Sequence, residues 1–278
     1  TAFPGKDGKF VLVTGNQMGA LLADYVLLSK KEFNKMPDNP VLIRSIVTSP
    51  FVDAVAKSYN VSVKECLTGF KWIAAVEAEM EKSGKEHYAF GLEESYGYKV
   101  ESEVRDKDGV SAAAMCAEMT LYWASKGKSL LDHLNDLYKK LGYFEDAAIS
   151  KYFEGISGPA IMGGIMTKLR TEGLKTLGGK KVLCIRDIQE SVSFDPANPS
   201  VKKPVDFPKS NVLQFFLEDG TVVSARPSGT EPKIKFYVNT KVPVEGESDE
   251  GLAKAKEIAH ELCNKISAEI NAMLDAAK

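Results

Sequence analysis

One segment of the chain concentrates chemical groups that bind phosphate. Residues 226–233 have the sequence Arg-Pro-Ser-Gly-Thr-Glu-Pro-Lys. The guanidinium of Arg226 is a planar fork that can donate to two phosphate oxygens at once, and the hydroxyls of Ser228 and Thr230 add further donors. Gly229 lets the backbone come close to an anion with its N–H groups turned inward. These residue types at this spacing predict a phosphate-binding loop.

The alternative for the same segment is an ordinary surface turn, because Pro, Ser and Gly are frequent turn formers. Pro227 and Pro232 would stiffen both ends of a binding loop, so that less entropy is lost when a ligand binds. The residue types alone leave both interpretations open.

Glu93 and Ser95 form a second candidate site. They lie two residues apart, so in an extended segment their side chains project to the same side. A carboxylate in that place can accept from two adjacent sugar hydroxyls, and the serine hydroxyl can donate or accept. The pair therefore suits a hexose, although the same residue types occur in many surface loops.

Lys71 lies at the start of an expected helix, directly after Gly69 and Phe70. A lysine there can reach a phosphate as a mobile point charge; the alternative is a solvated surface lysine. The histidines have no nearby partners with the spacing of metal ligands, so we expect packing or surface roles for them and no metal site in this chain.

The elements that must position these residues differ between the two parts of the chain. In the first part, apolar runs predict strands at residues 9–14, 41–47, 61–63 and 88–90. The nearly continuous run 10–13 predicts a strand buried on both faces. Helical spacing predicts helices between the strands and, later, at 110–126 and 130–141, the latter capped by Ser129. This alternation predicts an α/β domain with a mixed, mostly parallel sheet at residues 1–156.

The second part groups its strands before one long helix. Strands are expected at residues 182–185, 211–217, 221–225 and 233–239, with a proline-rich loop at 195–208. One apolar stripe at helical spacing predicts the terminal helix, and its members are Leu252, Ile258, Ala259, Leu262, Ile266, Ile270 and Leu274. We therefore expect a small α+β domain with an antiparallel sheet at residues 157–278.

Composition limits the classes of partner. The 278 residues carry a formal net charge of −2, with 44% hydrophobic and 27% charged residues, as is usual for globular domains. This charge gives no general attraction to nucleic acid or to a membrane surface. The four cysteines are scattered and are expected to remain reduced thiols. With no signal segment or membrane span in the sequence, we expect a cytoplasmic protein.

Four segments together resemble one enzyme family. Residues 226–233, which continue as Ile-Lys-Phe-Tyr-Val, are similar to the phosphate-binding loop of the α-D-phosphohexomutases (phosphoglucomutase/phosphomannomutase). Residues 91–98, Gly-Leu-Glu-Glu-Ser-Tyr-Gly-Tyr, resemble the sugar-binding loop of that family. Residues 14–22 and 67–73 fit two further segments, and all four occur in the order of the family.

The resemblance implies roles for individual residues. Arg226, Ser228, Gly229 and Thr230 would hold the non-reacting phosphate of a hexose phosphate. Glu93 and Ser95 would orient the sugar, and Lys71 would face the active-site cleft. Many members of the family have Gly-His after the serine, where this chain has Tyr96-Gly97. The tyrosine form resembles a bacterial phosphoglucomutase branch, and the choice between glucose and mannose phosphates stays open.

The phosphoserine loop and the metal loop of the family do not occur in this sequence. The resemblance therefore implies the third and fourth domains of a longer enzyme, whose N-terminal domains would supply the phosphoserine and Mg²⁺, with glucose 1,6-bisphosphate as the intermediate. We expect this chain alone to show no mutase turnover. The alternatives are a non-catalytic phosphosugar-binding or regulatory module, and a scaffold that binds a partner protein.

Overall fold

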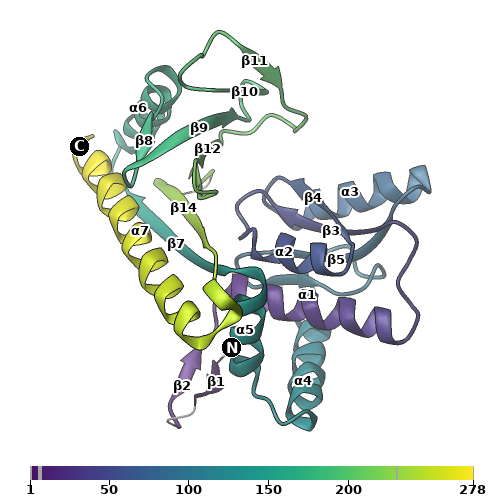
Figure 1. Ribbon diagram of the computed structural model, residues 1–278. Coiled ribbons are helices and arrows are strands. Elements are labelled where there is room, and N and C mark those ends of the chain that lie inside the picture. Colours follow the sequence, from purple (N-terminus) through teal and green to yellow (C-terminus); the bar gives the residue numbers. More distant parts are fainter. Residues whose placement is uncertain (1, 6–7, 230, 278) are drawn as a thin grey trace. The chain divides into compact units, whose positions relative to one another are not determined.

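The computed structural model describes residues 2–5, 8–229 and 231–277 (Figure 1). Contacts within the chain define two compact units. The first comprises the chain up to Gly142 together with Val244–Leu252, and the second comprises Tyr143–Pro243 with the chain from Ala253 onward. This division differs from the expected boundary at 156/157, because strand β7 (Tyr143–Tyr152) pairs along its whole length with β14 (Lys233–Val242) of the second unit.

The first unit has an α/β architecture with one main sheet. In chain order it contains β1 (Ala2–Pro4), β2 (Phe10–Leu12), α1 (Gly15–Glu32), β3 (Pro40–Ser45), α2 (Phe51–Ser58), β4 (Ser62–Cys66), α3 (Phe70–Ser83), β5 (His87–Glu93), β6 (Gly97–Lys99), α4 (Gly109–Ser125), α5 (Leu130–Leu141) and the short 3₁₀ turn η1 (Glu245–Glu247). The strand order is β4-β3-β5-β6. Strand β3 is parallel to both neighbours and only β6 is antiparallel, which confirms the expected mixed, mostly parallel sheet.

Strand β3 presents alternate side chains to the two faces of this sheet. Val41 and Ile43 pack with the apolar side of α3. Arg44 points to the opposite face, where its Nε and Nη2 atoms donate to Asp53 of α2 at 2.5 and 2.7 Å. Helices α2 and α3 therefore cover opposite faces, and α1 packs beside α2. Both faces being covered explains why the strands are apolar almost throughout.

Two helices of this unit begin with capping boxes, in which side chains replace missing backbone partners. Thr14 accepts from the N–H of Gln17 at 3.2 Å, and the Gln17 side chain accepts from the N–H of Thr14 at 3.0 Å. Ser129 and Asp132 form the same arrangement at α5. The expectation that Ser129 caps a helix is confirmed.

The expected strand at residues 9–14 is wrong in its environment. Strand β2 pairs only with β1, in an antiparallel two-stranded ribbon that is separate from the main sheet. Phe10 and Leu12 are 75% and 69% exposed, so β2 is not buried on both faces. An apolar run shows that a segment can be buried, but it does not show which element covers it.

The second unit is an antiparallel sheet covered by helices. It contains β7, α6 (Gly158–Thr171), β8 (Thr176–Leu177), β9 (Lys180–Asp187), β10 (Val192–Phe194), β11 (Lys202–Pro204), β12 (Leu213–Leu217), β13 (Val222–Pro227), β14 and most of α7 (Asp249–Asp275). The main strands follow the order β11-β10-β9-β12-β13-β14-β7, and β8 pairs with β9. All pairings in this order are antiparallel, which confirms the expected α+β class. The expected loop 195–208 contains the short strand β11.

One apolar core joins the sheet of the second unit to α6 and α7. Phe215 and Phe236 of the sheet pack with Met166 of α6 and Ile270 of α7. The expected stripe on α7 needs one correction, because Ile258 is 45% exposed. The buried stripe instead runs through Leu252, Ala255, Ala259, Cys263, Ile266, Ile270 and Leu274. None of the described helices combines the length and the apolarity of a membrane span.

A buried ion pair links α3 to β6 in the first unit. The ammonium of Lys99 donates to Glu77 Oε1 at 2.8 Å, and both side chains are 1% exposed. The Tyr88 ring lies 3.8 Å from the same ammonium. Burial lowers the pKa of Lys99, and the hydrogen bond to Glu77 opposes this shift. The pair is costly to break, because each charge depends on the other for compensation.

We predict that Glu77→Ala lowers the free energy of unfolding by about 3–5 kcal/mol, because Lys99 is left buried without its counterion. Urea denaturation measures this change. Glu81→Ala is the matched control: it lies on the same helix, its side chain is 50% exposed and it pairs with Arg105. Its expected cost is about 0–1 kcal/mol. Equal losses in the two variants would contradict the prediction.

Candidate functional site

The first unit collects polar groups where its parallel strands end. Strands β3, β4 and β5 end at Ser45, Cys66 and Glu93, and parallel strands bring these ends to one edge of the sheet. In open α/β sheets this edge is where ligands bind. Burial raises the pKa of the Cys66 thiol to about 12, so this cysteine is not a nucleophile at neutral pH.

Glu93 is fixed by the backbone at the start of α3. Its Oε1 atom accepts from the N–H of Gly69 at 2.5 Å. Gly69 has φ 111°, a conformation that side chains with a Cβ rarely adopt, so a glycine is required there. The positive end of the α3 dipole also favours a carboxylate in this position. The structure thus joins two segments that the sequence placed far apart, 91–98 and 67–73.

Lys71 lies in the first turn of α3, two residues after Gly69, and is exposed. Its ammonium is 5.3 Å from the centre of the Trp72 ring. The structure therefore brings Lys71 to the same edge of the sheet as Glu93, on the helix that Glu93 contacts. A phosphate-binding role for this lysine stays a prediction.

Ser95 and Glu94 form a small polar network in the loop between β5 and β6. The exposed Ser95 hydroxyl donates to Glu94 Oε1 at 2.9 Å, and Ser45 donates to Glu94 Oε2 at 3.3 Å. The sequence analysis selected Ser95 but not Glu94 or Ser45. Two consecutive glutamates before a serine were visible in the sequence, but the contact with Ser45 depends on the pairing of β3 with β5.

The start of α1 packs closely against this loop. A Cβ atom on Gly15 would lie 1.9 Å from the carbonyl oxygen of Glu94, so only a glycine fits. The neighbouring Asn16 accepts from the N–H of Ser49 through its Oδ1 at 3.0 Å. Segment 14–22 therefore shapes the loop that carries Glu93 and Ser95, and the loop after β3 is held to it.

The phosphate-loop candidate lies in the second unit, between β13 and β14. Arg226 pairs in register with Lys235 of β14, on the sheet face opposite to the buried Ala225 and Phe236. Among the described residues, no side chain forms a hydrogen bond or an ion pair with the Arg226 guanidinium, which leaves its donors available to a ligand.

The loop itself is ordered by short-range contacts. The N–H of Ser228 donates to Lys233 O at 3.0 Å, and the Ser228 hydroxyl accepts from the N–H of Glu231 at 3.2 Å. Lys233 and Glu231 form an ion pair. A Cβ on Gly229 would meet no atom within 4 Å, so there is open space beside it. Thr230, the remaining predicted residue, lies outside the described residues.

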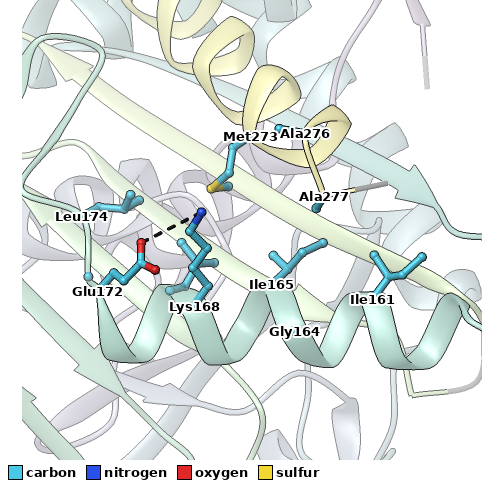
Figure 2. Close-up of a pocket in the computed structure, with 11 residues that line it drawn as sticks. Ile161, Gly164, Ile165, Lys168, Glu172, Leu174, Met273, Ala276 and Ala277 are labelled. Atoms are coloured by element: carbon cyan, nitrogen blue, oxygen red, sulfur yellow. Dashed lines mark ion pairs between the residues drawn. The ribbon is translucent and has the colours of Figure 1, made fainter.

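A distinct apolar pocket of about 280 Å³ lies between α6 and the end of α7 (Figure 2). Ile161, Ile165 and Met273 contribute apolar lining, and the only ion pair drawn there joins Lys168 to Glu172 at 4.0 Å. None of the sequence-predicted site residues lines this pocket. In the described part of the chain, no group of three or more His, Cys, Asp or Glu side chains is placed to hold a metal ion.

Comparison with known proteins places this geometry in a family. Residues 14–141 match the α/β/α domain III of phosphoglucomutase/phosphomannomutase, and residues 166–265 match the C-terminal domain of the same family. The chain belongs to the phosphoglucomutase/phosphomannomutase family. The candidate sugar loop lies in its domain III, and the candidate phosphate loop lies in its C-terminal domain.

Individual relatives agree with this assignment. Phosphoglucomutase of Staphylococcus epidermidis is 36% identical over 233 residues, which are 84% of this chain and 41% of that protein. Phosphoglucomutase of Staphylococcus aureus is 36% identical over 240 residues, 85% of this chain and 41% of that protein. The crystal structure of the Paramecium phosphoprotein parafusin, a phosphoglucomutase in its open form, has the same fold, with a TM-score of 0.55 and 18% identity over 92% of this chain and 42% of that one. The chain spans less than half the length of these relatives.

We predict that Gly15→Ala lowers the free energy of unfolding by about 1–3 kcal/mol, because the added methyl group forces the Glu94 carbonyl away from α1. Gly163→Ala is the matched control: this glycine is also helical, but a Cβ there meets no atom within 4 Å. Alanine at that position should stabilise α6 by about 0.5–1 kcal/mol. Denaturant titration of both variants measures the difference, and a Gly15 variant as stable as the control would contradict the close approach.

Proposed function

We propose that this chain is the sugar-holding and phosphate-holding part of a phosphohexomutase that interconverts hexose 1-phosphate and hexose 6-phosphate. The observation that carries the proposal is the match of both units, in order, to domain III and the C-terminal domain of the family. The polar groups fit the proposal, because each unit contains one loop whose side chains suit one part of a hexose phosphate.

In this proposal the second unit grips the phosphate that does not react. The Arg226 fork donates to two phosphate oxygens, and Ser228 and the backbone of Gly229 complete the loop. The hairpin is stiff because β13 and β14 pair from Val222 to Pro227. Binding energy gained at such a remote group positions the reacting phosphate for transfer.

The first unit would orient the sugar ring. Glu93 accepts from sugar hydroxyls while its other oxygen contact, the N–H of Gly69, keeps the carboxylate in place. Ser95 is exposed and carries a hydroxyl beside it. Both orientations of the hexose must bind during the reaction, and hydroxyl contacts of this kind suit a ring that is read from either end.

The described residues do not form a metal site, so we assign Mg²⁺ no contact and no step in this chain. The phosphoryl donor is likewise not assigned to a residue here. Both would come from other parts of a protein as long as the relatives. The contribution proposed for this chain is binding and orientation.

We predict that Arg226→Ala weakens binding of glucose 1,6-bisphosphate by about 1.5–3 kcal/mol, the range for hydrogen bonds to charged groups. Calorimetric titration of the 278-residue chain measures this change. Lys241→Ala is the matched control, because it removes one positive charge from an exposed position near the other end of β14. Its affinity should match that of the unaltered chain. Equal binding by the Arg226 variant would show that this loop is not the phosphate site.

A further inference from the structure

Tyr96 has a backbone conformation that is unusual for its residue type. Its φ is 59°, in the left-handed region where a side chain with a Cβ is strained. Asparagine tolerates this region better than a bulky aromatic residue. The other non-glycine residues with positive φ among those described are Asn34, Asn39, Asn60, Ser191 and Glu247.

The hairpin explains where this conformation comes from. Glu93 pairs with Gly97 across β5 and β6, which leaves a three-residue loop that ends at Tyr96. Loops of this length commonly require a left-handed residue, and glycine is favoured for it. Here glycine instead follows, at Gly97, where a Cβ would lie 2.5 Å from the Phe70 ring. The chain therefore carries a tyrosine at a position that the backbone alone would give to glycine.

Anchoring of the loop does not account for this tyrosine. Tyr98, two residues later, is 5% exposed and its hydroxyl already donates to Gly15 O at 2.8 Å. Tyr96 also has an anchored hydroxyl, which donates to Val13 O at 3.1 Å, but its side chain is 49% exposed. The anchored hydroxyl holds the ring in one orientation while much of its surface remains open to solvent.

We propose that Tyr96 is the aromatic wall of the sugar site and packs its ring against the C–H face of a hexopyranose phosphate. This inference rests on the proposed function, because it takes Glu93 and Ser95 as the residues that bind the sugar hydroxyls. A sugar ring has polar edges and apolar faces, so a site that binds only the hydroxyls leaves one face in contact with water. An aromatic ring beside those hydroxyl partners removes that face from water.

The anchored hydroxyl makes this wall effective. A tyrosine has few rotatable bonds, and the contact with Val13 restricts them before a ligand arrives. Less conformational entropy is then lost on binding. A backbone conformation that disfavours Tyr96 is consistent with this role, since strained residues concentrate at functional sites. The ligand class is a pyranose phosphate, and a phosphate without a sugar ring gains nothing from Tyr96.

The test is calorimetric titration of the 278-residue chain with two probes, glucose 1,6-bisphosphate and inorganic phosphate. Tyr96→Gly should raise the Kd for the bisphosphate about three- to tenfold, as expected for loss of an aromatic contact, and leave the Kd for inorganic phosphate unchanged. Tyr96→Phe keeps the ring and should recover most of the affinity. Asn60→Gly relieves the same type of backbone strain at φ 58°, after α2, and should not alter either Kd.

Three results would overturn the inference. If Tyr96→Gly binds the bisphosphate as tightly as the unaltered chain, the ring does not contact the sugar. If Tyr96→Phe loses as much affinity as Tyr96→Gly, the hydroxyl anchor matters and the ring face does not. If the unaltered chain binds neither probe, the proposed function fails for this chain, and the role of Tyr96 fails with it. Binding of both probes by the unaltered chain, with no effect of Tyr96→Gly, would reject the Tyr96 role alone.

Discussion

The hydrogen bond from the N–H of Gly69 to the Glu93 carboxylate is the contact on which the candidate sugar site depends. It joins the end of β5 to the start of α3 and exists only because Gly69 adopts φ 111°. A carboxylate held in this way has a fixed orientation before any ligand arrives, which reduces the entropy lost on binding. Gly15 sets a second constraint, since its missing side chain lets α1 approach the Glu94 carbonyl.

The second unit achieves a comparable rigidity by different means. Its phosphate-loop candidate is carried by two long strands whose inner faces belong to a large apolar core. Arg226 and Lys235 lie on the outer face, where their charges are not buried among apolar side chains. Chemistry is thus placed on loops and outer faces, while the packed elements behind them fix their positions, as is common for binding sites.

Local patterns predicted many elements correctly, and their failures have a common cause. Helix α5 begins and ends where its spacing and Ser129 place it. The run that forms β2 was apolar enough for a buried strand, but it pairs only with β1 and is exposed. The division between the two units follows the pairing of β7 with β14, residues about ninety positions apart in the chain, which local periodicity does not report.

The sequence by itself determined which chemical groups are present and their local order: the Arg226 loop, the Glu93–Ser95 spacing, and most helices and strands. These depend on residue types within a few positions of one another. Only the tertiary structure decided which groups meet. Gly69 and Glu93 are 24 residues apart, and the tyrosine at Tyr96 touches Val13, 83 residues earlier. Such contacts depend on strand order and on close approach at glycines, which no single segment of the sequence specifies.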